Sequence, residues 1–215
     1  MNAHFPPEQS IRLSAIPQIK RELSRLHPHV LGRTWFKRLM ERDRIGKAMT
    51  DQALNLDFCL VGRSGADGRM RCGLVVAIPG PGAEALFASY GDAPIFFGFL
   101  FGFSDQSGFD AVLAEVRALA AERGRKSLIG PFEATINYCC GLMEDEPAFP
   151  PGVLMPEAPP AWNRFFEASG FTVAERMYTF EVELEHASFQ VMGSRVVSDM
   201  PVSYTHLRAH ETVLD

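Results

Sequence analysis

The sequence has 215 residues, of which 47% are hydrophobic, and a formal net charge of -5 at pH 7. This apolar content is enough for the core of a folded domain and excludes a disordered chain. The most apolar run, Ile95–Phe103, is about half the length of a membrane-spanning helix, and the N-terminus lacks the basic and apolar regions of a secretory signal. We therefore expect a cytoplasmic protein that does not associate with membranes.

Basic residues concentrate at the N-terminal end. Residues 1–50 carry ten Lys and Arg against four Asp and Glu. Such a surplus could attract nucleic acid or another anionic ligand. Within Thr34–Met49, however, the basic residues alternate with apolar ones at helical spacing, which is typical of the solvent face of an amphipathic helix. We favour this interpretation and do not expect nucleic-acid binding.

The first elements predicted along the chain are a short strand at Ile11–Leu13 and a helix at Pro17–Leu26. We interpret His27-Pro28-His29 as an exposed turn between helices rather than as a pair of metal ligands. Two strand-like runs, Leu56–Val61 and Met70–Ile78, flank a segment rich in turn-forming residues. They are predicted to pair as a hairpin.

The run Ile95–Phe103 is predicted to be a buried strand with two unlike faces. Alternation places four phenylalanines on one face: Phe97, Phe99, Phe101 and Phe103. The other face carries Phe96, Gly98, Leu100 and Gly102. Because glycine weakens a strand, two glycines on one face indicate that a helix or an extended ligand approaches the backbone there.

The clearest helix spans Phe109–Ala120, where apolar residues recur at helical spacing. Ser107, with Asp110 three residues later, suits its start, and Gly124 suits the left-handed position after its end. An extended run follows at Ser127–Gly130.

A long proline-rich connection, Glu144–Pro160, precedes the last elements and is of the kind that often covers a site. A short helix then begins at Pro159-Pro160 and closes at Gly170, with one face formed by Trp162, Phe165 and Phe166. A strand is predicted at Thr172–Leu184. The order of elements predicts a mixed α/β (α+β) fold.

The four cysteines are Cys59, Cys72, Cys139 and Cys140. Because none has the spacing of a metal site, no bound metal is expected. The adjacent pair Cys139-Cys140 could include a reactive thiol, although we favour buried packing residues.

The C-terminal string Val202–Thr212 resembles one reading frame through a transposase adaptor used in sequencing libraries. We therefore expect a single, C-terminally truncated domain over residues 1–200 and a non-native tail over 201–215.

The stretch Arg164–Phe171, which leads into the last predicted strand, resembles the closing helix and strand of the GNAT superfamily of acyl-CoA N-acyltransferases. More narrowly, Gly130–Leu142 is similar to a bacterial branch of GNAT-like proteins. The resemblance covers Ile11–Leu184. It implies a mixed, mostly antiparallel central sheet flanked by helices.

The resemblance also implies a site for acetyl-CoA or another acyl-CoA. The pantetheine arm would pair with a strand that splays from its neighbour, along Gly98, Phe99, Leu100 and Phe101. The amides at Ser107 and Gly108 would bind the pyrophosphate at the N-terminus of a helix.

Two departures from the family pattern stand out. The segment Ser104–Gly108 lacks the usual basic residue and paired glycines, and Asp105 would repel phosphate. The usual tyrosine general acid aligns with Phe166, which has no proton to donate. Tyr138 and Tyr178 are candidate substitutes, although we favour tyrosines half-buried in the core. Asn137 matches the asparagine of the narrower branch, where it either contacts a ligand or caps a turn.

The function implied is acyl transfer from acyl-CoA, or from another carrier thioester, to an amine acceptor that is a small molecule or a protein. Catalysis would rest on orientation of the substrates and polarisation of the carbonyl. The alternative is a non-catalytic GNAT-like domain that binds a ligand or partner.

Overall fold

The computed structural model describes residues 9–30, 49, 55–83, 87, 89–132, 140–144 and 158–177. The chain divides into two compact units, residues 1–172 and 173–215. All described helices and strands belong to the first unit. Among the described residues, no helix combines the length and apolar character needed to span a membrane.

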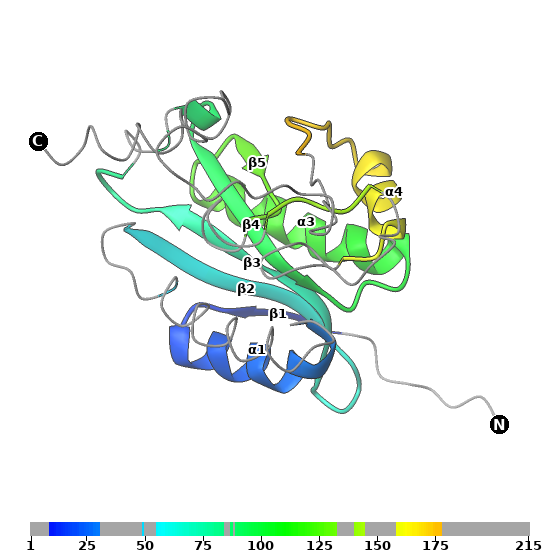
Figure 1. Ribbon diagram of the computed structural model, residues 1–215. Coiled ribbons are helices and arrows are strands. Elements are labelled where there is room, and N and C mark those ends of the chain that lie inside the picture. The colour runs from blue at the N-terminus through cyan, green and yellow to red at the C-terminus, as the bar shows by residue number, and fades with distance from the viewer. Residues whose placement is uncertain are drawn as a thin grey trace, which may run out of the picture. The chain divides into compact units, whose positions relative to one another are not determined.

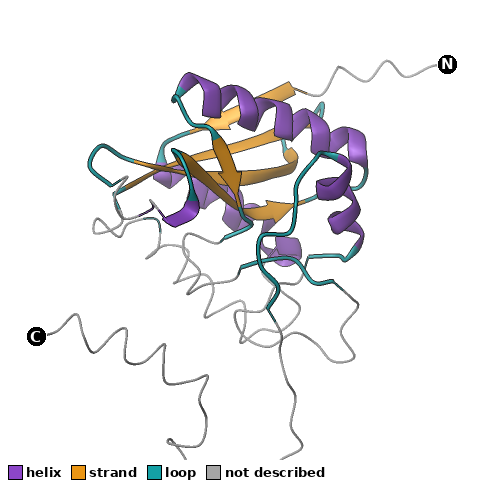
Figure 2. Ribbon diagram, turned by 90° about the horizontal axis from the view of Figure 1, so that it is seen from above, coloured by secondary structure: helices purple, strands orange, loops and turns teal. Residues whose placement is uncertain are grey.

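The first unit is a five-stranded sheet with helices on both faces (Figure 1; Figure 2). In chain order the elements are β1 (Gln9–Leu13), α1 (Ile16–Val30), β2 (Leu56–Ser64), β3 (Met70–Pro79), β4 (Pro94–Phe101), α3 (Gln106–Glu122), β5 (Ser127–Ile129) and α4 (Ala161–Ala168). The strands lie side by side in the same order, β1-β2-β3-β4-β5. Every neighbouring pair is antiparallel except β4 and β5. The predicted mixed, mostly antiparallel sheet flanked by helices is confirmed.

The predicted hairpin is confirmed by the pairing of β2 with β3, from Leu56 opposite Pro79 to Ser64 opposite Met70. Its turn is closed by a hydrogen bond from the Gly65 amide to the Arg69 carbonyl at 2.9 Å. The Asp67 carboxylate accepts a further bond from the Arg69 amide at 3.1 Å. Short polar side chains of this kind stabilise turns through their own backbone, so the turn residues determine this register locally.

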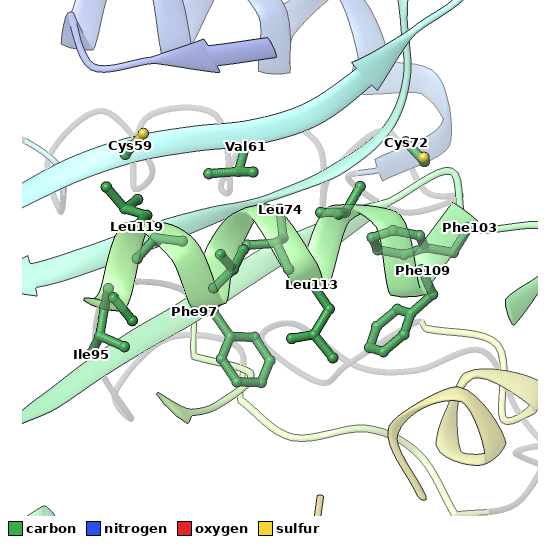
Figure 3. Packing of buried hydrophobic residues seen from close by; sticks show 14 of the residues in the cluster. Cys59, Val61, Cys72, Leu74, Ile95, Phe97, Phe103, Phe109, Leu113 and Leu119 are labelled. Carbon is green, nitrogen blue, oxygen red and sulfur yellow. The ribbon is translucent and has the colours of Figure 1, made fainter. Parts of the chain in front are cut away.

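Alternation along the strands divides the core into two layers. On one face of the sheet, Ile19 and Leu23 of α1 pack with residues that include Phe58, Leu60 and Val75. On the other face, helices α3 and α4 cover a second cluster. Its fully buried members include Val61, Val76, Ile95, Phe109, Val112 and Val116. Figure 3 shows Phe103 and Phe109 gathered at one end of α3, and Ile95 and Leu119 at the other.

Helix α1 is longer than predicted. It continues through His27, Pro28 and His29 to Val30, so the prediction of a turn at these three residues is wrong. A proline removes one donor from the helical ladder and disfavours helix at the residue before it. In this last turn the lost bond does not end the helix.

Two other predicted elements lie largely outside the described residues. Of the helix expected at Thr34–Met49, the structure describes Met49 alone, which is buried. Of the strand expected at Thr172–Leu184, the described part, residues 172–177, has no strand pairing, so the prediction is wrong for that part. Residues 178–184 lie outside the described part of the chain.

Candidate ligand-binding edge of strand β4

Strand β4 contains a bulge. Gly98 lies opposite Val75 of β3, but the next matched pair is Phe101 with Gly73. Two residues of β4, Phe99 and Leu100, therefore face the single residue between Gly73 and Val75. Phe99 has a φ of 50°, a left-handed conformation that is unusual for a residue with a bulky side chain. The ring of Phe99 is nevertheless 3% exposed, so packing holds the strained backbone in place.

The bulge overturns the predicted division of phenylalanines between two faces. Phe97 and Phe103 pack in the cluster under α3, whereas Phe99 and Phe101 pack in the cluster under α1. An extra residue shifts the pleat by one position, which moves Phe99 and Phe101 to the face opposite Phe97. Phe103, which follows Gly102 with its φ of 72°, lies again on the face of Phe97. The expectation that all four rings share one face is therefore wrong.

The predicted bare face is also wrong at Gly102. Its φ is 72°, and a Cβ added there would overlap the carbonyl oxygen of Arg71 on β3. The group that approaches this glycine is the backbone of the neighbouring strand, not a ligand or helix. Gly98 is buried within β4.

Strand β4 runs well past its partner β5 (Figure 1). The parallel pairing joins only Pro94–Phe96 to Ser127–Ile129. One further hydrogen bond runs from the Phe132 amide to the Phe97 carbonyl at 2.7 Å. Among the described residues, no strand pairs with Gly98–Phe101 on this side of β4. We call Gly98–Phe101 the β4 edge. It contains the four residues that the family resemblance assigns to the pantetheine arm.

The candidate catalytic residues Asn137 and Tyr138 lie outside the described residues. The two ends of their segment are described: Phe132 pairs with Cys140, and the Gly141 amide donates to the Pro131 carbonyl at 2.9 Å. Because Phe132 also bonds to Phe97, these ends meet where β4 and β5 part.

At the start of α3, Asp105 caps the helix. Its Oδ1 accepts a hydrogen bond from the Gly108 amide at 2.8 Å, and its Oδ2 accepts one from the Ser104 hydroxyl at 3.1 Å. The bond from the Gly108 amide, followed by that from Ser104, lowers the pKa of Asp105. The predicted start at Ser107 is wrong, because Asp is as good an N-cap as Ser and here precedes it. The predicted end is confirmed: Gly124 has a φ of 62°.

Polar groups join the start of α3 to the end of α4. The Gln106 amide nitrogen donates to Asp110 Oδ1 at 2.8 Å and to Ser169 Oγ at 3.1 Å. The Ser169 hydroxyl in turn donates to Asp110 Oδ1 at 2.8 Å. These bonds, that from Ser169 first, lower the pKa of Asp110. They fix α4 beside the segment that follows β4.

Helix α4 presents an aromatic face to the core, as predicted. Trp162 is buried and donates its indole N–H to the Phe103 carbonyl at 3.0 Å. Phe166 is 7% exposed and stacks on Phe97 with ring centroids 5.7 Å apart. Phe166, which the resemblance aligns with a tyrosine acid, is therefore a packing residue in this chain.

Tyr90 was missed by the sequence reasoning. It is the one tyrosine in the part of the chain that the structure describes, and its side chain is 36% exposed. Its ring lies edge-on to Phe96 at 5.4 Å and to Phe132 at 6.3 Å. It therefore lies near the parting of β4 and β5. No periodic pattern marks it, because it lies in a short 3-10 turn between β3 and β4.

The described cysteines support packing roles. Cys59 and Cys72 are buried, and burial raises the pKa of Cys59, which opposes formation of a reactive thiolate. Cys140 is half-buried, and Cys139 lies outside the described residues. Within the described ranges, no group of three His, Cys, Asp or Glu side chains could hold a metal ion.

Comparison with known proteins gives no assignment: no protein-family model, curated protein or solved structure matches the chain.

Proposed function

We propose that this domain transfers an acyl group from a pantetheine-containing thioester, such as acetyl-CoA, to an amine. The observation that carries this proposal is the β4 edge. Strand β5 pairs with only three residues of β4, Pro94–Phe96, and does not pair with Gly98–Phe101. An extended chain with amide groups can add to such an edge through main-chain hydrogen bonds. A pantetheine arm is an extended chain of this kind.

In the proposed reaction, the amine nitrogen attacks the thioester carbonyl. A C–N bond forms, the C–S bond breaks, and the thiol leaves with the proton that the amine loses. Holding the two reactants in place would supply much of the acceleration. Asn137 and Tyr138 are the proposed catalytic residues, since the ends of their segment lie at the parting of β4 and β5.

The second candidate is a domain that binds a ligand or partner without catalysis. Two observations favour it. Asp105 occupies the Gly108 amide that would serve a pyrophosphate, and Phe166 is buried in the core. The Gly108 amide and the side chain at the tyrosine position are thus used to build the fold.

Binding is tested by calorimetric titration of acetyl-CoA, together with hydrogen–deuterium exchange. We expect slower exchange of amides within the β4 edge in the presence of ligand. The amides of β1, at the opposite edge of the sheet, provide the internal control and should not change. If a folded protein takes up no ligand, or if both edges change equally, the proposed site is wrong.

Catalysis is tested by following release of free thiol from acetyl-CoA in the presence of a panel of amines. Replacing Asn137 by Ala should lower the rate on the order of a hundredfold without changing binding, as for loss of one carbonyl-polarising group. The matched control is Asn163→Ala on α4, which should leave the rate unchanged. Binding without any amine-dependent thiol release would support the non-catalytic candidate instead.

A further inference from the structure

The start of α3 lies within reach of any ligand on the β4 edge. Three residues, Gly102, Phe103 and Ser104, separate the end of β4 from Asp105. Even fully extended, the four steps from Phe101 to Asp105 span at most about 14 Å. A ligand that lies along β4 and continues beyond it therefore arrives at the α3 N-terminus.

A free helix N-terminus favours anions, because its first amides have no partner within the helix. In α3, one of these amides, that of Gly108, already has a hydrogen-bond partner. The Asp105 carboxylate accepts from the Gly108 amide at 2.8 Å and is itself exposed. Its lowered pKa means that this carboxylate is charged at neutral pH. A phosphate at this point would have to displace or approach a negative charge.

No basic residue of the connecting segment compensates for this charge. Residues 102–108 contain no Lys, Arg or His. Arg71, whose backbone lies against Gly102, directs its guanidinium to Asp67 at 3.1 Å. On the α3 side, the next ionisable group is Asp110, which is a second carboxylate.

From this arrangement, and resting on the proposed function, we infer that Asp105 determines donor specificity. The β4 edge recognises the uncharged pantetheine arm of the thioester, and Asp105 excludes the pyrophosphate of a nucleotide. The donor class is thus a pantetheine thioester presented without a nucleotide, as on a carrier protein, rather than free acyl-CoA.

The inference is tested with three ligands of rising negative charge: pantetheine, 4′-phosphopantetheine and coenzyme A. Calorimetric titration of the full chain should give the weakest binding for coenzyme A, about fivefold weaker than for pantetheine, a difference typical of one exposed charge at a helix terminus. The difference should shrink in 0.5 M salt, because salt screens exposed charges.

Asp105→Asn provides the decisive variant, since Asn also caps helices and the fold should persist. It should raise coenzyme A affinity about fivefold and leave pantetheine affinity unchanged. The control, Asp57→Asn, removes an exposed charge beside Arg123 at the other end of α3 and should change neither affinity by more than about twofold.

Each result separates the inference from the proposed function. If a folded protein binds none of the three ligands, the proposed function fails. If coenzyme A binds at least tenfold more tightly than pantetheine, or if the two variants have equal effects, the pantetheine site stands and the role of Asp105 is wrong.

Discussion

The β2–β3 hairpin and the β4–β5 region belong to the same sheet but are built differently. In the hairpin, pairing runs continuously from Leu56 opposite Pro79 to Arg63 opposite Cys72, with its only irregularity at the turn. In the second region, β4 contains a bulge at Phe99 and pairs with β5 over three residues. The hairpin is thus stabilised by regular pairing. The β4 region combines strain with an edge that, among the described residues, β5 pairs only in part, and strained backbone often marks a functional site.

The largest expected effect comes from two glycines that share a positive φ. Gly102 has a φ of 72° and Gly68, in the hairpin turn, has 70°. A Cβ at Gly68 would meet nothing, whereas a Cβ at Gly102 would overlap the Arg71 carbonyl. Gly68→Ala should cost about 1 kcal/mol, the penalty of the left-handed conformation. Gly102→Ala should cost more than about 3 kcal/mol, because strain and overlap add.

Chemical denaturation of the two variants measures this difference. If Gly102→Ala and Gly68→Ala lower the free energy of unfolding equally, Gly102 does not lie against the Arg71 carbonyl of β3.

The next largest effect is a difference in unfolding free energy between substitutions at Phe99, in the bulge, and at Val76, in the regular part of β3. Replacing Phe99 by Ala should lower the free energy of unfolding by about 3 kcal/mol, since a buried ring is lost. A further change from Ala to Gly should cost about 0.5–1 kcal/mol at position 76. At position 99 the same change should cost nothing or be stabilising, because glycine tolerates a φ of 50°.

The sign of the Ala-to-Gly step is the test, measured by denaturant unfolding of both pairs of variants. A cost at position 99 equal to that at position 76 would mean that Phe99 occupies an ordinary strand conformation.

A smaller effect on stability is expected from the ion pairs between α3 and strand β1, at the edge of the sheet opposite β5. Arg12 of β1 bonds to Glu115 and to Glu122 of α3, both at 2.9 Å. These side chains are partly exposed, so the pairs should contribute only about 0.2–1 kcal/mol. A double-mutant cycle with Arg12→Met and Glu115→Gln measures the coupling, which should decrease in 1 M salt. A coupling that salt does not change would show that contacts other than charge join them.

The smallest effect is a dependence of stability on pH at Asp105. Its folded-state pKa lies below the unfolded value of about 3.9, because the Gly108 amide and the Ser104 hydroxyl stabilise the carboxylate. The stabilisation is therefore present above the unfolded pKa and is lost as pH falls through the folded pKa. The difference in stability between the natural chain and Asp105→Asn should be constant near pH 7 and shrink below about pH 4. If the difference in stability is the same near pH 7 and below about pH 4, the charged Asp105 carboxylate does not stabilise the start of α3.

The elements that the sequence predicted correctly share one property: their signal is local and repeated. The hairpin is recognised from two apolar runs and turn residues, and α3 from the spacing of Phe109, Val112 and Val116. Helix α4 and its aromatic face follow from the same helical period. The candidate site was predicted in part. The glycines of Ile95–Phe103 drew attention to β4, although Gly102 contacts β3 rather than an open face.

By itself the sequence determined the fold class, the hairpin and the two helices beside the candidate site, because periodicity and turn chemistry act between residues close in the chain. Only the tertiary structure decided the bulge at Phe99, the cap at Asp105 and the short pairing of β5 with β4. The bulge and the short pairing depend on how β4 pairs with both β3 and β5 while its side chains pack into the core on both faces of the sheet. Alternation in one strand carries no information about its partners, so a shift of one residue cannot be predicted from it.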